Sequence, residues 1–144
     1  MTRINTIDVD LLPMPWLVAE YRELPRIINR VAGGQPFEVI PVTYRMGTGH
    51  VSFFGNKLNW LYARHLLLRT ELRERGGCPT MDCNEAYFKC VDKYPRLCQS
   101  RWQPDAEDHM VNLRRLEERW TTAVRMKTVD LPRWLNQVIK RHNL

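Results

Sequence analysis

No apolar run in this 144-residue sequence reaches the length of about 20 residues that a membrane-spanning helix needs. The N-terminal segment carries Asp8 and Asp10 and lacks a continuous apolar stretch, which is not typical of a secretory signal peptide. Internal repeats, low-complexity tracts and a clear β-strand pattern are also missing. Hydrophobic residues nevertheless make up 44% of the chain, which argues against disorder. We therefore expect a cytoplasmic protein with no membrane partner, folded as a single domain over residues 1–144.

Cysteine is scarce and irregularly spaced. The four cysteines, Cys78, Cys83, Cys90 and Cys98, are separated by four, six and seven residues, so the close Cys-x-x-Cys pair typical of zinc sites is missing. In a reducing cytoplasm they are expected to be thiols that pack as small buried hydrophobes. We predict no metal site and no cofactor. A zinc-stabilised nucleic-acid adaptor remains the alternative that this cluster leaves open.

Positive charge is in excess, with 22 Lys and Arg residues against 16 Asp and Glu residues and a formal net charge of +6. Most of the cations are arginines. A basic domain is attracted to nucleic acid because its cations neutralise phosphates and release counterions. The same charge would also suit RNA or an anionic membrane surface, so charge alone does not select DNA.

Hydrophobic periodicity predicts an all-α domain with three main helices, an irregular N-terminal arm and long loops. The arm covers residues 1 to about 12, and a loop with extended pieces is expected over 35–56. The helices are expected at residues 13–32, 57–75 and 105–125, with shorter ones at 84–91 and 131–141. Gly33-Gly34 and Gly76-Gly77 are expected to end the first two main helices, and Asp130 to cap the last short one.

The first helix separates a core face from a charged face. Pro25 lies inside it and is expected to kink the helix or open one backbone hydrogen bond. The apolar positions that share one face are Leu17, Tyr21, Leu24, Ile28 and Val31. The charged positions, within an arc of about 100° on the opposite side, are Arg22, Glu23, Arg26 and Arg30. The core positions expected in the later main helices are Leu58, Leu61, His65, Leu68, Leu72, Met110, Leu113, Leu116 and Trp120.

The chain begins with a residue pair that allows an unusual nucleophile. Thr2 is small, so Met1 should be removable, which leaves the α-amino group of Thr2 as the first group of the mature protein. The reference pKa of an α-amine lies well below that of lysine, so a useful fraction is unprotonated at neutral pH. A free amine can form a Schiff base with an aldehyde-like carbon.

Three blocks of sequence carry a family resemblance. They are Thr2-Arg3-Ile4-Asn5 with Ala19 to Arg26, then Gly49 to Phe54 with Lys57-Leu58, and a weaker block at Arg115 to Arg119. In these blocks the chain resembles the phage pyrimidine-dimer DNA glycosylases with AP-lyase activity, the ultraviolet-damage repair enzymes also called the phage endonuclease V family. The spacing from the terminal amine to the carboxylate is that family's catalytic signature. Residues 76–102 show no such match.

The resemblance implies roles for named residues. Thr2 is expected to be the nucleophile and Glu23 the carboxylate that stabilises the cationic intermediate and moves a proton, so that no cofactor is needed. Arg3, Arg22 and Arg26 are expected to hold DNA phosphates. The implied partner is double-stranded DNA with a lesion or an abasic site, bound by a monomer in a bacterial or phage-infected cell.

Several further positions carry two interpretations each. Lys57 and Arg119 either contact DNA phosphates or belong to a solvated helix face, and His50 and Arg30 are candidates whose role is functional or structural. Trp16 replaces a polar residue of the phage enzymes, and it either wedges into the base stack or anchors the first turn in the core. The C-terminus lacks the tyrosine-rich tail of those enzymes, which leaves the lesion open. A non-catalytic binder of distorted DNA on the same scaffold is the second alternative.

Overall fold

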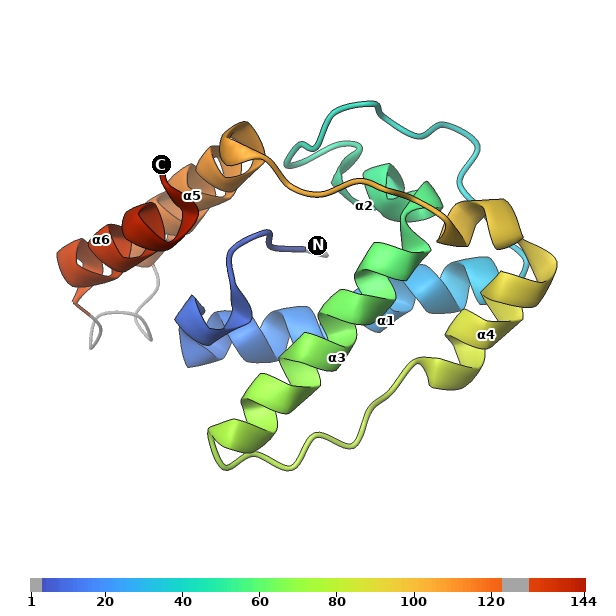
Figure 1. Ribbon diagram of the computed structural model, residues 1–144, viewed down its shortest axis with the longest axis horizontal. Coiled ribbons are helices and arrows are strands. Elements are labelled where there is room, and N and C mark those ends of the chain that lie inside the picture. Colours follow the sequence, from blue (N-terminus) through green and yellow to red (C-terminus); the bar gives the residue numbers. More distant parts are fainter. Residues whose placement is uncertain (1–3, 123–129) are drawn as a thin grey trace.

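The computed structural model describes residues 4–122 and 130–144, and the part it describes is all-α, as predicted (Figure 1). The described α-helices are α1 (Met14–Ala32), α2 (His50–Phe53), α3 (Leu58–Glu74), α4 (Asn84–Lys93), α5 (Ala106–Thr122) and α6 (Leu131–His142). Three short 3-10 helices are η1 (Val9–Leu11), η2 (Phe54–Asn56) and η3 (Pro95–Cys98). None of the described helices is long and apolar enough to cross a membrane.

Local sequence signals coincide with three helix ends. α1 ends immediately before Gly33-Gly34, and Gly76, with φ +88°, takes the left-handed conformation just after α3. Asp130 caps α6 as expected, because its carboxylate accepts a hydrogen bond from the Arg133 N–H at 3.1 Å. The predicted third main helix runs to Thr122, and its remaining predicted residues, 123–125, lie outside the described part.

The prediction of a loop over residues 35–56 was wrong for its last third. Gly49, with φ +88°, turns the chain into the four-residue helix α2, which continues into η2. Helices this short contain about one turn, so no 3.6-residue periodicity could reveal them. The change is important because it buries His50, Phe53 and Phe54.

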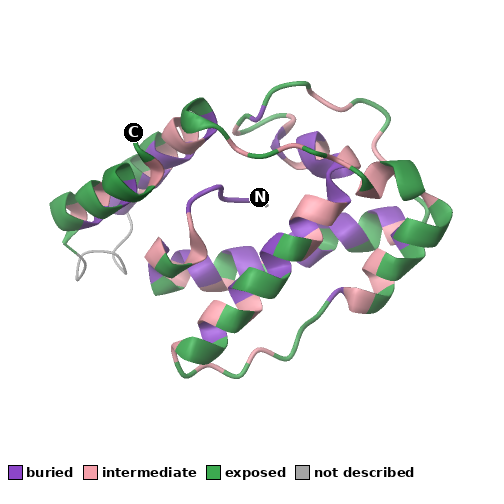
Figure 2. Cartoon of the chain, in the orientation of Figure 1, coloured by how far each residue is buried: buried purple, intermediate pink, exposed green. Residues whose placement is uncertain are grey.

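The core lies where α1 and α3 cross at the centre of the molecule (Figure 1). The buried residues form one continuous cluster that links these helices to the N-terminal arm and the α5–α6 pair (Figure 2). All predicted core positions of α1 and α3 are buried, and in α5 Leu113, Leu116 and Trp120 are buried while Met110 is half-buried. Burial on this scale is the main term that stabilises the fold.

Pro25 is accommodated inside an uninterrupted α1 by a bond from the neighbouring helix. Proline has no N–H, so the carbonyl of Tyr21, one turn earlier, loses its helical partner. The Nε2–H of His65 donates to that carbonyl at 3.2 Å, and the rings of His65 and Tyr21 stack with their centroids 5.2 Å apart. The opened backbone hydrogen bond expected from the sequence is therefore replaced by a bond from α3.

The N-terminal arm runs between the α1–α3 pair and the α5–α6 pair (Figure 1). Trp120 of α5 packs on Trp134 of α6, with centroids 5.0 Å apart, and the indole N–H of Trp134 donates to the Leu11 carbonyl. Arg141 of α6 forms ion pairs with Asp8 and Asp10. The arm thus connects the α1–α3 pair to the α5–α6 pair instead of lying on the surface.

Two histidines, His109 and His142, also contact the arm at this junction, and they make the stability of the fold depend on pH. His142 Nε2 accepts the Asp8 N–H at 3.2 Å, His109 Nδ1 lies 2.9 Å from Thr6 Oγ1, and the two rings are 4.1 Å apart. Burial lowers the pKa of His109, His142 and His65. A histidine with a lowered folded pKa contributes stability that is complete above the unfolded value and is lost as the pH falls through the folded value.

We therefore expect the melting temperature to fall as the pH decreases from about 6.5, the unfolded value, to about pH 5. Thermal unfolding followed by circular dichroism across this range measures the effect. His142→Gln, which removes one of the three titrating rings, should give a smaller fall than the parent chain. A melting temperature that is flat across the range would contradict the assignment of these histidines as neutral, buried groups.

Candidate active site

The outer face of α1 presents one carboxylate among cations. Arg22 and Arg26 are exposed, while Glu23 between them is half-buried next to the buried Leu24. Neither guanidinium forms an ion pair within the part of the chain that the structure describes. The two arginines are one turn apart and can reach neighbouring phosphates, because Arg donates to phosphate through two N–H groups at once. The geometry agrees with the charged face predicted for this helix.

The N-terminal arm is held in the interior from its first described residue. Ile4, Asn5 and Thr6 are all buried. The Ile4 N–H donates to His50 Nε2 at 2.8 Å, and the Ile4 carbonyl accepts from the Tyr44 hydroxyl at 2.8 Å. Thr2 and Arg3, the predicted nucleophile and one predicted phosphate ligand, lie outside the described residues.

His50 is an interior residue with a fixed tautomer. Its Nε2 accepts from Ile4, and its Nδ1–H donates to the Arg45 carbonyl at 2.7 Å. Its ring packs edge-on against Tyr44 and Phe54. Of the two interpretations of His50, the structure supports an anchor for the arm.

Sequence reasoning missed two residues that hold the arm. Tyr44 lies in an irregular segment and gave no periodic signal. Asn112 is fully buried in α5, where its Oδ1 accepts the Thr6 N–H at 2.8 Å. A signal for Asn112 existed, since it is a polar residue one turn before Leu116 on the apolar stripe of its helix, and buried polar groups are normally hydrogen-bonded.

One predicted DNA contact, Lys57, and one further candidate, Arg30, are engaged within the protein. The Lys57 ammonium is buried, donates to the Phe53 carbonyl and to Asn56 Oδ1 at 2.9 and 2.8 Å, and burial lowers its pKa. A phosphate contact requires an exposed ammonium, whereas the chain turns at η2 and brings the Lys57 side chain inside. Lys57 is therefore not part of the proposed DNA surface. Arg30 remains exposed, but its Nε–H donates to the Gln35 carbonyl and its guanidinium covers the Phe37 ring.

The two remaining candidates lie at the edge of the core. Trp16 is only 8% exposed, which agrees with its interpretation as the anchor of the first turn of α1. Arg119 is half-buried on α5, where burial and the neighbouring Arg115 lower its pKa. The contact of Arg119 with a DNA phosphate stays a prediction. A wedge role for Trp16 would require its side chain to leave the core.

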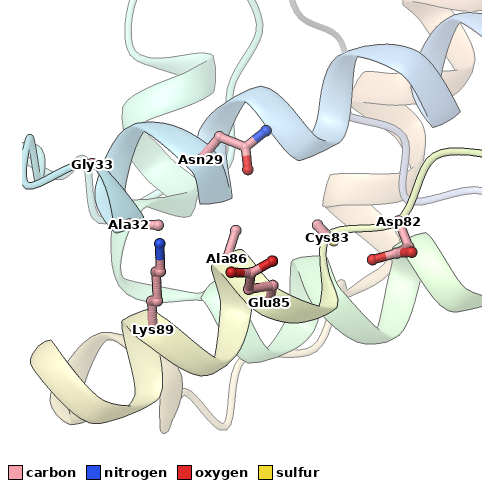
Figure 3. Close-up of a pocket in the computed structure, with 8 residues that line it drawn as sticks. All are labelled: Asn29, Ala32, Gly33, Asp82, Cys83, Glu85, Ala86 and Lys89. Carbon is pink, nitrogen blue, oxygen red and sulfur yellow. The ribbon is translucent and has the colours of Figure 1, made fainter.

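A cavity of about 430 Å³ lies between the end of α1 and the start of α4 (Figure 3). Asn29, one turn along α1 from Arg26, borders it, and Lys89 extends from α4 towards the end of α1. The exposed carboxylates of Asp82 and Glu85 also line the cavity. The cavity is therefore lined by charges of both signs, with two carboxylates against one ammonium, and the carboxylates repel phosphate.

The cysteines form no metal site in the described chain, which includes all four of them. No group of three or more His, Cys, Asp or Glu side chains in that part is arranged to hold a metal ion. Cys83 and Cys90 are buried, and burial raises the pKa of Cys83 to about 11, so it remains a thiol. The zinc-adaptor alternative therefore has no supporting ligand cluster.

Comparison with known families agrees with this geometry. A family model described as pyrimidine dimer DNA glycosylase matches residues 1–85, which is more than half of the 144-residue chain. The matched part includes the arm, α1, Tyr44, His50 and α3, and it ends at the start of α4. The match confirms the family resemblance and covers the first two sequence blocks, while the third block, Arg115 to Arg119, lies outside the matched residues. The chain belongs to the pyrimidine dimer DNA glycosylase family and is a DNA repair glycosylase whose substrate is damaged DNA.

Proposed function

We propose that this protein excises pyrimidine dimers or a related base lesion and then cuts the strand through a Schiff base at the α-amine of Thr2. The observation that carries the proposal is the fixation of Ile4, two residues after Thr2, at both its N–H and its carbonyl. A reactive amine needs such an anchor, because positioning converts a slow bimolecular attack into an intramolecular one. Glu23, on the outer face of α1, supplies the carboxylate that the chemistry requires.

In the first step, the bond from C1′ to the base nitrogen is replaced by a bond from C1′ to the Thr2 nitrogen. The Thr2 amine attacks C1′ of the damaged nucleotide, the bond from C1′ to the base breaks, and the base leaves with that electron pair. The amine loses a proton, its lone pair forms a C=N bond, and the sugar ring opens as C1′–O4′ breaks and O4′ takes up a proton. A cation develops at C1′ during this step, and a nearby carboxylate such as Glu23 stabilises it electrostatically.

The second step cuts the strand. A base removes a proton from C2′, and the protonated imine accepts that electron pair to form an enamine. The enamine returns the pair to form a C2′=C3′ double bond and restore the protonated imine, while the C3′–O bond breaks and the 3′ phosphate leaves with its electrons. Water then hydrolyses the C=N bond to free the amine. Glu23 is the proposed proton acceptor at C2′, in line with the contribution that a positioned carboxylate makes to general base catalysis.

The arginines of the site are proposed to hold a distorted duplex. C1′ of a stacked nucleotide is shielded, so the protein must bend or unstack the DNA before the attack. Arg22 and Arg26 are exposed on one side of α1, and Arg3 directly follows the nucleophile in sequence. Guanidinium groups at these positions would grip the phosphates on both sides of a kink.

Borohydride trapping tests this function. The purified protein is mixed with an abasic-site duplex and with a dimer-containing duplex in the presence of borohydride, and covalent adducts are resolved by denaturing electrophoresis. The expected result is an adduct and a nicked strand with both duplexes. Selective acetylation of the terminal amine, or a chain that retains Met1, should abolish both. Duplex binding without any adduct would overturn the proposal in favour of a non-catalytic binder of distorted DNA.

A further inference from the structure

The residues next to the proposed nucleophile are held by a set of buried hydrogen bonds, which we call the arm clamp and define by Tyr44, His50 and Asn112. His50 accepts from the Ile4 N–H, and Tyr44 donates to the Ile4 carbonyl. Asn112 accepts from the Thr6 N–H through Oδ1 and donates to Asn5 Oδ1 through Nδ2, at 2.8 and 3.2 Å. Residues 4–6 are therefore each hydrogen-bonded to a side chain outside the arm.

The orientation of each polar group in the arm clamp follows from its partners. The Thr6 N–H fixes the orientation of the Asn112 amide, because only the oxygen can accept it. The single proton of the Tyr44 hydroxyl is shared between two acceptors, Asn112 Oδ1 at 2.6 Å and the Ile4 carbonyl at 2.8 Å, so the hydroxyl joins the two parts of the clamp. Burial raises the pKa of Tyr44 well above its ordinary value, which keeps the hydroxyl protonated as a donor.

The members of the clamp come from segments far apart in the chain. Tyr44 lies before α2, His50 is in α2, and Asn112 is in α5, beyond the residues 1–85 that the family model matches. All three are buried, with 3%, 2% and 0% of their surface exposed. The arm can therefore be held as described only after α5 has packed against the N-terminal half of the fold.

The number of residues between the first fixed residue and the terminal amine sets how far the amine can move. With Ile4 fixed, the Thr2 amine is confined to a radius of about 7 Å. Without the clamp, the first fixed residue would be Thr6, whose hydroxyl lies 2.9 Å from His109 Nδ1, and four residues of chain would give a radius of about 14 Å. The accessible volume grows with the cube of the radius, so the local concentration of the amine would fall by roughly eightfold.

We propose that Tyr44, His50 and Asn112 are positioning residues of the glycosylase reaction, which hold residues 4–6 so that the terminal amine remains at the site of attack. This inference rests on the proposed function, because it assumes that the amine is the nucleophile. None of the three residues needs to touch the DNA. Their loss is therefore expected to reduce the rate of bond formation and leave duplex affinity unchanged.

The test compares two hydroxyl deletions. Tyr44→Phe removes the clamp donor and keeps the ring that packs against His50, Phe53 and Phe54. Tyr62→Phe is the matched control, because its hydroxyl donates to Asn84 Oδ1 at 2.7 Å, between α3 and α4 and away from the arm. Single-turnover trapping with borohydride on an abasic-site duplex gives the rate of Schiff-base formation, and binding to an uncleavable duplex gives Kd.

Tyr44→Phe removes one hydrogen bond of the clamp and is expected to trap about fivefold more slowly than the parent chain, with Kd within twofold, while Tyr62→Phe traps at the parent rate. A second pair is His50→Gln, whose side-chain oxygen can replace the acceptor for the Ile4 N–H, and His50→Leu, which cannot. Gln should retain more of the trapping rate than Leu, and hydrogen exchange of the Ile4 amide should accelerate in the Leu variant.

The outcomes separate this inference from the function on which it rests. If the parent chain forms no adduct, the proposed function and the positioning role are both overturned. If the parent chain forms the adduct and Tyr44→Phe traps as fast as Tyr62→Phe, the arm clamp has no positioning role and the proposed function is unaffected. Equal losses of Kd and trapping rate in Tyr44→Phe would also overturn the inference, since they indicate a DNA contact.

Discussion

Replacing Glu23 with glutamine is expected to reduce strand nicking by about 10²–10⁴-fold while duplex binding is retained. The substitution keeps the size of a half-buried side chain and removes its negative charge. Without that charge, the cation that develops at C1′ loses its electrostatic partner and the C2′ proton loses its acceptor. Single-turnover cleavage of a dimer-containing duplex, with Kd measured in parallel, separates the chemical step from binding.

Glu74→Gln is the matched control, because Glu74 is an exposed residue of the last turn of α3. The control removes the same charge from the same kind of helix and should nick at the parent rate. If Glu23→Gln nicked as fast as the control, Glu23 would have no catalytic role. A loss of affinity that accounts for all of the lost activity would instead make Glu23 a binding residue.

Replacing Glu20 with alanine is expected to lower the free energy of unfolding by about 3–5 kcal/mol. Glu20 of α1 accepts two hydrogen bonds from Arg64 of α3, at 2.7 and 3.1 Å, and both side chains are almost fully buried. The alanine variant leaves the Arg64 guanidinium buried without its carboxylate, and an uncompensated buried charge is far more costly than a lost surface contact. Urea unfolding followed by circular dichroism measures the change.

Two comparisons test whether the buried charge is the cause. Glu71→Gln removes the carboxylate of the more exposed pair with Arg75 and should cost less than about 1 kcal/mol. Glu20→Leu combined with Arg64→Met removes both charges and should recover much of the stability that Glu20→Ala loses. If Glu20→Ala cost no more than Glu71→Gln, the pair between α1 and α3 would not be the buried ion pair described above.

The long helices followed from the sequence because their signals are local and repeated. In α1 the apolar spacing placed Leu17, Tyr21 and Leu24 in the core, and the glycine pair after Ala32 ended the helix where expected. The separation of Arg22 from these core positions followed from the same periodicity. Several turns of helix give such a pattern enough positions to be recognised.

The anchors of the N-terminal arm could not be predicted because they depend on tertiary contacts. Asn112 meets Thr6 across 106 residues of sequence, and Tyr44 meets Ile4 across 40. Lys57 was expected at the surface because a lysine is normally exposed, yet the turn at η2 brings its ammonium onto two internal oxygens. These positions are fixed by where helices distant in sequence pack, which no local pattern contains.

The central claim is that the covalent bond to deoxyribose forms at the α-amine of Thr2. Digestion of the borohydride-reduced adduct, followed by mass spectrometry of the N-terminal peptide, locates that bond directly. We expect Met1 to be absent and the sugar remnant to be attached to the Thr2 nitrogen. A remnant on the side chain of a lysine, with the terminal amine unmodified, would contradict the account.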